Sequence, residues 1–168
     1  MQRSQPLAIV LIGLPGSGKS TWARDFIAQQ PQYQLISTDI IRAQLYGDEA
    51  AQGEWNQIWY QVQQRLREGL AQAGKSTAPP MGIVYDATNV RRRYRRRLLG
   101  TLKTLGYSTG GLWFDLPVAC CLRRNQQRTR QVPEAVILRM GRQIQGARPA
   151  VAEGFDWLIR LCPPEQPV

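Results

Sequence analysis

The stretch that decides the fold is GLPGSGKST, residues 13–21. Its first eight residues match the phosphate-binding loop pattern G-x-x-x-x-G-K-[ST] at every fixed position. The apolar run before it, residues 7–12, predicts a buried strand, and residues 21–29 after it carry Trp22 and Phe26 at helical spacing. The sequence therefore predicts a strand, a phosphate-binding loop and a helix, in that order.

The residues of this loop suit the binding of a nucleoside triphosphate. The glycines allow backbone N–H groups to turn toward one anion, and the start of the following helix adds the positive end of its dipole. We expect Lys19 to reach the β- and γ-phosphates and the Ser20 hydroxyl to ligate Mg²⁺. The expected ATP-binding residues of the loop are Gly13, Gly16, Ser17, Gly18, Lys19, Ser20 and Thr21. The alternative is a glycine-rich turn that binds nothing.

Composition narrows the class of protein. The length of 168 residues fits one domain, expected at residues 1–162, with a proline-rich tail at 163–168. No apolar stretch reaches about 18 residues, so we expect no membrane partner. The odd number of cysteines, two of them adjacent at Cys120 and Cys121, favours reduced thiols, no disulfide partner and a cytoplasmic location. Because the chain has no histidine, any proton acceptor must be a carboxylate or another group.

The positive charge is concentrated in one segment. The formal net charge is +10, and residues 91–148 hold fourteen Arg or Lys against only Asp115 and Glu134. The rest of the chain has slightly more acidic than basic residues. Such a field favours a polyanionic partner, nucleic acid above all. The alternative is a solvated basic face that serves only solubility.

Strands and helices are expected to alternate, which predicts an α/β fold with a central parallel sheet covered by helices on both faces. The expected strands are residues 7–12, 34–37, 82–85, a part of 107–116, and 155–161. The expected helices are residues 21–29, 40–45, 55–73, 91–105, 118–128 and 134–145. Gly74 is expected to cap the third helix, before a loop at 77–80. Ligands of such sheets bind beyond the carboxyl ends of the strands, so the phosphate loop, Asp39 and Asp86 should surround one crevice.

Two of the expected helices have a marked apolar face. The face of residues 55–73 begins with Trp55 and Trp59. In residues 91–105 we expect Tyr94 and four leucines to point inward and the six arginines of 91–97 to point outward. That arginine run either contacts the phosphates of a nucleic acid, which carry no sequence information, or faces solvent. We expect no catalytic role for it.

Asp39 follows the second expected strand and is placed to act as a general base. Transfer of a γ-phosphoryl group to a hydroxyl needs an acceptor for the hydroxyl proton and positive groups around the moving phosphate. Arg42 lies one helical turn later on the same side, where it could grip the transferred phosphate or the acceptor. The alternative is that Asp39 only caps the helix that begins at Ile40.

Asp86 ends the third expected strand. A carboxylate at this place belongs either to the water shell of Mg²⁺ or to the anchor of a neighbouring arginine. Thr88 and Asn89 follow at the start of the basic helix, where they orient a substrate or cap the helix. For these two residues we favour capping.

Four arginines cluster where the fifth expected helix meets a polar loop, namely Arg123, Arg124, Arg128 and Arg130. Because the planar guanidinium binds phosphate with two hydrogen bonds, an arginine-rich segment near residues 123–131 could close over ATP as a lid and exclude water. The alternative is a helix end whose basic residues offset the helix dipole. Four arginines within eight positions exceed that need, so we favour the lid.

Taken together, the motifs resemble the kinase domains of polynucleotide 5′-hydroxyl kinases, within the wider group of AAA_33-type P-loop kinases, over nearly the whole chain. The matching pieces are GLPGSGKST (13–21), STDIIR (37–42), GDE (47–49), VYDATN (84–89), DLPVACCLRRNQQR (115–128), QVPEAVILRM (131–140) and EGFDWLIRL (153–161). The phosphate loop alone is shared by many NTPases, whereas its combination with D-x-x-R (39–42), D-x-T-N (86–89) and R-N-x-x-R (124–128) is much more specific.

The resemblance implies a P-loop kinase fold and ATP-dependent phosphoryl transfer to the 5′-hydroxyl of RNA or DNA. It implies that Asp39 is the general base, that Arg42 contacts the acceptor phosphate and that Asp86 supports the acceptor site. Arginines at positions 124 and 128 would belong to the lid over ATP. The expected catalytic residues are Lys19, Asp39, Arg42 and Arg128, and the expected acceptor-binding residues are Arg42, Asp86 and Asn89.

Two other functions stay open at this point. The first is phosphorylation of a small-molecule hydroxyl on a metabolite, nucleoside or antibiotic, although a small neutral acceptor would not require the basic segment. The second is an ATP-dependent nucleic-acid-binding module with little turnover, although a pure binder would need no base beside the phosphates. The sequence carries no indication of the oligomeric state.

Overall fold

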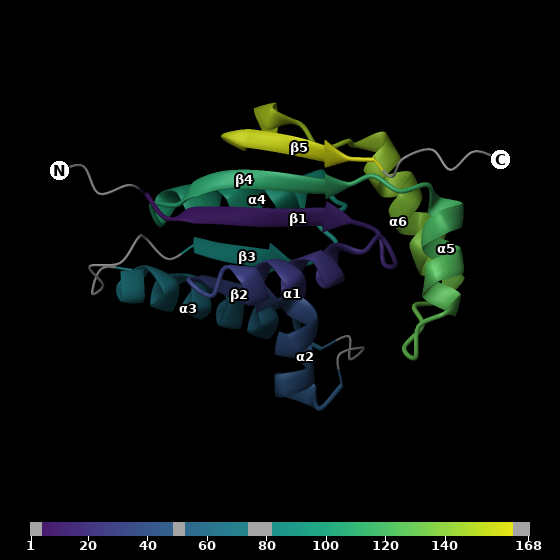
Figure 1. Ribbon diagram of the computed structural model, residues 1–168, viewed down its shortest axis with the longest axis horizontal. Coiled ribbons are helices and arrows are strands. Elements are labelled where there is room, and N and C mark those ends of the chain that lie inside the picture. Colours follow the sequence, from purple (N-terminus) through teal and green to yellow (C-terminus); the bar gives the residue numbers. More distant parts are fainter. Residues whose placement is uncertain (1–4, 49–52, 74–81, 163–168) are drawn as a thin grey trace.

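The computed structural model describes residues 5–48, 53–73 and 82–162, and its centre is a sheet of five parallel strands (Figure 1). The strands are β1 (Leu7–Gly13), β2 (Tyr33–Ser37), β3 (Gly82–Asp86), β4 (Ser108–Phe114) and β5 (Trp157–Leu161). The helices are α1 (Lys19–Gln29), α2 (Thr38–Tyr46), α3 (Trp55–Ala73), α4 (Arg92–Thr104), α5 (Val118–Gln126), α6 (Glu134–Gly146) and the 3₁₀ helix η1 (Val151–Glu153). The expected cap at Gly74, loop at 77–80 and tail at 163–168 lie outside the described residues.

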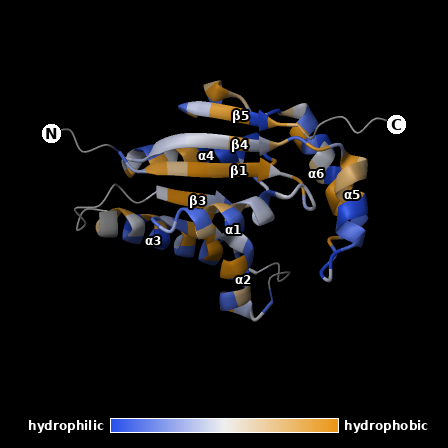
Figure 2. Ribbon diagram, in the orientation of Figure 1, coloured by the Kyte–Doolittle hydropathy of each residue, from blue (hydrophilic) through white to orange (hydrophobic). Residues whose placement is uncertain are grey.

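The strands run in the order β2-β3-β1-β4-β5, and every neighbouring pair is parallel. Strand β1 lies in the middle, so its apolar run is buried on both faces. Figure 2 shows the hydrophobic colour along β1 and its neighbour β3. The predicted α/β class with a parallel sheet is therefore confirmed.

Helices cover both faces of the sheet, as predicted. On one face Ile9 and Leu11 of β1 pack with Ala23 of α1. On the other face Val10 and Ile12 belong to a larger core that includes apolar residues of α3, α4 and α6. Each fully buried Leu, Ile or Val contributes about 1.5–3 kcal/mol to the stability of the fold. Figure 1 shows α5 and α6 beyond the arrowheads of the strands, at the edge where the phosphate loop leaves β1.

Helix α4 corrects one prediction about its inward face. Leu98 and Leu102 are buried as expected, but Tyr94 is 39% exposed and Arg95 is completely buried. Residues 95, 98, 99 and 102 form the i, i+3, i+4, i+7 stripe, so helical spacing itself places Arg95 inward. A buried guanidinium needs a partner, and its partner Glu153 lies 58 residues away in the sequence. Sequence spacing alone could not reveal that pair.

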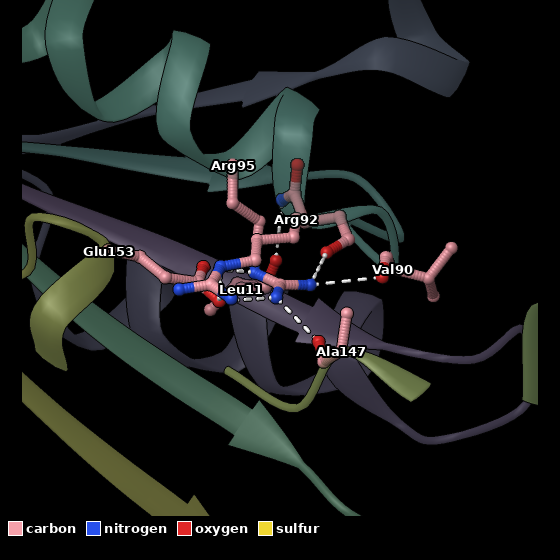
Figure 3. Close-up of polar contacts among 7 residues, drawn as sticks. Leu11, Val90, Arg92, Arg95, Ala147 and Glu153 are labelled. Atoms are coloured by element: carbon pink, nitrogen blue, oxygen red, sulfur yellow. Dashed lines mark hydrogen bonds and ion pairs between the residues drawn. The ribbon is translucent and has the colours of Figure 1, made fainter. Parts of the chain in front are cut away.

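Arg95 joins three segments behind the phosphate-loop edge of the sheet (Figure 3). Its Nε and Nη2 each donate a hydrogen bond of 2.6 Å to a carboxylate oxygen of Glu153 in η1. Its Nη1 donates to the carbonyl oxygens of Asn89 and Val90, both at 3.0 Å, and Nη2 donates to that of Ala147 at 2.7 Å. All five N–H donors of the guanidinium are used. This side chain thereby fixes the loop between β3 and α4.

Candidate active site

A cavity of about 950 Å³ opens at the carboxyl ends of β1, β2 and β3, where the sequence places the site. Most of the residues singled out in the sequence line it, namely Gly16, Gly18, Lys19, Ser20, Thr21, Asp39, Arg42, Asp86, Asn89, Arg124 and Arg128. Gly13 and Ser17 instead lie buried at the base of the phosphate loop. One cavity thus brings together the phosphate loop, two carboxylates and several arginines.

The backbone of the phosphate loop requires its glycines. Gly16 and Gly18 have φ of +82° and +95°, a conformation that side chains rarely adopt. A Cβ at Gly16 would lie 2.5 Å from the carbonyl oxygen of Cys121 in α5, and one at Gly18 would lie 3.7 Å from Nη1 of Arg124. The loop therefore packs directly against α5, and the Arg124 guanidinium lies beside it.

Lys19 is the buried cation of the loop. It is 8% exposed, and its Nζ donates a hydrogen bond of 3.4 Å to the carbonyl oxygen of Leu14. Burial lowers the pKa of Lys19, while the carboxylates of Asp86 and Asp39 act in the opposite direction. The ammonium group is thus partly desolvated, and an incoming phosphate would restore the stabilisation that water no longer supplies.

Two buried polar atoms at the base of the site have no hydrogen-bond partner among the described residues. They are Oδ1 of Asp86, a residue 7% exposed, and Oγ of Ser17. Such atoms are costly unless a ligand or water satisfies them. Carboxylate and hydroxyl oxygens suit a hydrated Mg²⁺, and both Asp86 and Ser20 line the cavity. The donor set therefore fits the metal expected from the sequence, although the described residues contain no cluster of three or more acidic, Cys or His groups.

Asp39 does not cap its helix, so the capping interpretation was wrong. Helix α2 begins at Thr38, and the Oγ of Ser37 accepts the capping hydrogen bond from the N–H of Ile40 at 3.5 Å. Asp39 lies in the first turn with its side chain 49% exposed. Its Oδ1 is 2.8 Å from Nη1 of Arg42, and its Oδ2 is 3.7 Å from Nη1 of Arg130. One carboxylate in the cavity is thus held between two guanidinium groups.

The arginine-rich segment between α5 and α6 is closed at its base by a buried amide. Nδ2 of Asn125 donates to the carbonyl oxygen of Val132 at 2.8 Å, and Oδ1 accepts from the N–H of Val132 at 2.9 Å. Arg124, Arg128 and Arg130 line the cavity. Arg123 belongs to the predicted cluster but contacts Sγ of Cys120 at 3.3 Å. The clamp by Asn125 was missed, because residue type alone does not distinguish a structural asparagine.

Asn89 and Thr88 do not cap α4 either. The residue at the N-terminal cap position is Arg91, without a side-chain capping bond. Asn89 has φ of +50°, and its Nδ2 donates a hydrogen bond of 2.7 Å to the carbonyl oxygen of Leu11 in β1. The carbonyl oxygen of Thr88 accepts from the N–H of Gly13 at 3.0 Å. Both residues instead join the loop after β3 to β1 and the start of the phosphate loop.

Part of the cavity is lined by aromatic side chains that the sequence predicts in the hydrophobic core. Trp55 and Trp59 of α3 and Tyr94 of α4 line it, together with Arg91 and Arg97. Trp59 is buried, but Trp55 is 37% exposed and Tyr94 is 39% exposed. The signal that could have revealed them is an apolar stripe that begins with aromatic residues at the same edge of the sheet as the phosphate loop.

The first strand of the parallel sheet leads through the phosphate loop into a helix, and a carboxylate and arginines share the cavity beside it. This arrangement is the fold of P-loop kinases. Residues 9–147 match the AAA_33 family, described as an AAA domain, and the chain belongs to this family. The AAA_33 assignment expected from the motifs is therefore confirmed. Among the described residues no helix is long and apolar enough to cross a membrane, and Cys120, Cys121 and Cys162 are not in disulfides.

Known proteins are similar to this chain at low sequence identity. A curated L-seryl-tRNA(Sec) kinase of Methanococcus maripaludis is 23% identical over 138 residues, which cover 80% of this chain and 51% of that protein. A solved Pnkp1/Rnl/Hen1 RNA repair complex has a chain that is 24% identical with a TM-score of 0.74, over 86% of this chain and 45% of that chain. A gluconokinase of Sinorhizobium meliloti is 21% identical with a TM-score of 0.56, over 98% of this chain and 86% of that chain. The chain spans about half the length of the first two relatives.

Proposed function

We propose that this protein transfers the γ-phosphoryl group of ATP to the 5′-hydroxyl of an RNA or DNA end. The observation that carries the proposal is the Asp39 carboxylate, which shares one cavity with the phosphate loop and lies between Arg42 and Arg130. The family, the basic segment at 91–148 and the similarity to chains from RNA repair complexes support it.

On the ATP side, the phosphates occupy the loop formed by residues 13–20. Gly16 and Gly18 allow the backbone N–H groups to converge, α1 contributes its N-terminal dipole, and Lys19 supplies a buried positive charge. Ser20 and Asp86 would hold Mg²⁺, directly or through water. The metal would offset negative charge on the β- and γ-phosphates while the phosphoryl group moves.

On the acceptor side, Asp39 accepts the proton of the 5′-hydroxyl. The hydroxyl oxygen then forms a bond to the γ-phosphorus, the bond between that phosphorus and the β–γ bridging oxygen breaks, and ADP leaves. Arg42 orients the Asp39 carboxylate through its contact of 2.8 Å, and we propose that it also binds the phosphate that follows the acceptor hydroxyl. The absence of histidine from the whole sequence leaves a carboxylate as the natural base.

The segment near residues 123–131 would act as the lid over ATP. Arg124 lies beside Gly18 of the phosphate loop, and the charge of Arg128 adds a smaller contribution to the lowering of the Lys19 pKa that burial causes. Guanidinium groups in these places can neutralise charge that spreads over the transferred phosphoryl oxygens. Closure of the segment would also exclude water and so reduce hydrolysis of ATP.

The test is transfer of a radioactive γ-phosphate from ATP, with Mg²⁺, to a short oligonucleotide that carries a 5′-hydroxyl. The control is the same oligonucleotide with a 5′-phosphate. Label on the first alone supports the proposal, and a comparison of RNA with DNA then defines the acceptor. Label on both, or on neither while small-molecule hydroxyls become labelled, would contradict it.

A further inference from the structure

One part of the cavity lining is an assembly of aromatic rings and guanidinium groups that the chemistry of phosphoryl transfer does not require. Its members, named here the aromatic–arginine platform, are Trp55, Trp59, Tyr94, Arg91, Arg93 and Arg97. Five of them line the cavity that also holds Asp39 and Lys19, and Arg93 extends the platform from Tyr94 outward. The platform is built from two elements, the start of α3 and the start of α4.

The three aromatic rings contact one another, with Trp55 between Trp59 and Tyr94. The ring centroids of Trp55 and Trp59 are 6.4 Å apart with an interplanar angle of 20°, and those of Trp55 and Tyr94 are 6.1 Å apart with an angle of 34°. Trp59 is buried and supports Trp55, which remains 37% exposed, while Tyr94 remains 39% exposed. Two large rings are therefore partly exposed in the same cavity as the proposed acceptor-binding residues.

Guanidinium groups surround these rings. The Cζ of Arg93 lies 4.7 Å and that of Arg91 lies 5.7 Å from the ring centroid of Tyr94, and the Cζ of Arg97 lies 5.2 Å from that of Trp59. Nη2 of Arg93 also donates a hydrogen bond of 2.9 Å to the Tyr94 hydroxyl. Within the described residues none of these three arginines has a carboxylate partner. Their positive charge is therefore available to an anion.

We infer that the aromatic–arginine platform binds the first nucleotides of a single-stranded acceptor end. Unpaired bases stack on the exposed rings of Trp55 and Tyr94, and the phosphates between them contact Arg91, Arg93 and Arg97. Single strands present this alternation of flat bases and anionic phosphates, whereas a duplex keeps its bases stacked inside. The inference rests on the proposed function and narrows its substrate to a single-stranded polynucleotide, in place of a blunt duplex or a mononucleotide.

The test compares the full chain with Trp55→Ala and Tyr94→Ala. The matched control is Tyr60→Ala, because Tyr60 is an aromatic residue of the same helix as Trp55, is 55% exposed and does not line the cavity. Tyr94→Phe keeps the ring and serves as the conservative variant. Thermal melting of each variant shows whether it is folded before kinetics are measured.

The first measurement is the KM for a single-stranded 5′-hydroxyl oligonucleotide and for a nucleoside 3′-monophosphate as the minimal acceptor. Loss of one stacked base should raise the oligonucleotide KM of each Ala variant by about 5- to 100-fold. The KM for ATP should stay as in the wild type for every variant, as should all values for Tyr60→Ala. The minimal acceptor offers only one base, so its KM should rise less than that of the oligonucleotide. Tyr94→Phe keeps the ring but loses the hydrogen bond from Arg93, so it should lose less oligonucleotide affinity than Tyr94→Ala. An unchanged oligonucleotide KM, or an equal loss with both acceptors, would overturn the inference, as would preference of the wild type for a blunt duplex.

A second measurement separates this inference from the proposed function. Binding of a single-stranded oligonucleotide is followed without ATP by fluorescence anisotropy of a label at its 3′ end. Affinity that depends on Trp55 and Tyr94, in a protein that labels no 5′-hydroxyl, would retain the platform and reject the kinase proposal. If the protein transfers the phosphoryl group but its oligonucleotide affinity is the same in Trp55→Ala and Tyr94→Ala, the kinase proposal stands and the platform is rejected.

Discussion

Among single residues, Asp39 and Lys19 show what the sequence can and cannot reveal about the site. Their positions after β2 and in the phosphate loop were predictable, because both follow strands of a parallel sheet. The contact of Asp39 with Arg130 was not, since a distant loop supplies that arginine. Nor did the sequence show that Ser37, and not Asp39, caps α2. Local motifs thus located the groups, while their partners depend on tertiary structure.

Asp39→Asn should remove the proposed base while preserving the shape of the side chain. We expect kcat for a 5′-hydroxyl oligonucleotide to fall by about 10²- to 10⁴-fold, because a neutral amide cannot accept the proton. ATP affinity should remain close to that of the wild type, since Asp39 is not expected to contact the nucleotide. Steady-state kinetics and nucleotide titration measure the two quantities. Wild-type turnover in the variant would show that the residue is not the base.

Lys19→Met should stabilise the ligand-free protein and abolish its response to ATP. Burial lowers the pKa of Lys19, so its charged form opposes folding at all pH values below that lowered pKa, and the penalty disappears as pH rises toward 10.5. At neutral pH methionine removes the penalty, which should raise Tm by about 2–4 °C for each kcal/mol gained. Thermal melts with and without ATP and Mg²⁺ test this. An unchanged Tm shift with ATP would contradict the assigned role.

At the scale of elements, the strands were predictable and one helix face was not. Apolar runs buried on both sides of the sheet identify β1 and β3 directly. Helix α4 was placed within a residue or two of its bounds, but Tyr94 and Arg95 exchange their expected environments. The reason is the pair that Arg95 forms with Glu153, which converts an unfavourable buried charge into a satisfied one.

Arg95→Leu should destabilise the fold strongly. It leaves the fully buried carboxylate of Glu153 without its closest partner and removes donors from the carbonyl oxygens of Asn89, Val90 and Ala147. We expect a loss of about 3–5 kcal/mol in the free energy of unfolding. Urea denaturation measures it, with Arg96→Leu, an exposed arginine of the same helix, as the control. The double variant with Glu153→Leu should lose less than Arg95→Leu alone, and additive losses would argue against the pairing.

At the scale of the whole molecule, many of the basic residues gather around the cavity that holds the phosphate loop. The basic segment at 91–148 contributes α4, α5 and α6, and arginines from all three helices line the cavity, among them Arg97, Arg124 and Arg139. The net charge was readable from composition, but its convergence on one cavity was not. It results from the parallel topology, because α5 and α6 lie beyond the carboxyl ends of the strands and α4 begins after the carboxyl end of β3.

Oligonucleotide affinity should therefore fall steeply with salt. Each phosphate that the protein neutralises on a single strand adds a slope of about −0.7 to log K against log salt, so four to six phosphates give about −3 to −4. Arg93→Ala should reduce the magnitude of the slope by about 0.7, because the variant neutralises one phosphate fewer. Anisotropy titrations at several NaCl concentrations measure this. A flat salt response would show that the basic segment does not bind phosphates.

Because Gly16 packs against the backbone of Cys121, the reactivity of the Cys121 thiol can report the motion of α5 relative to the phosphate loop. The Cys121 side chain is completely buried, and burial raises the pKa of its thiol to about 11, so it should be inert while α5 rests on the phosphate loop. Alkylation of that thiol should then report how often α5 lifts away, with Cys162, which is exposed, as the internal standard. Saturating ATP should slow the alkylation of Cys121. The ratio of the alkylation rates of Cys121 and Cys162 would then measure how often α5 separates from the phosphate loop.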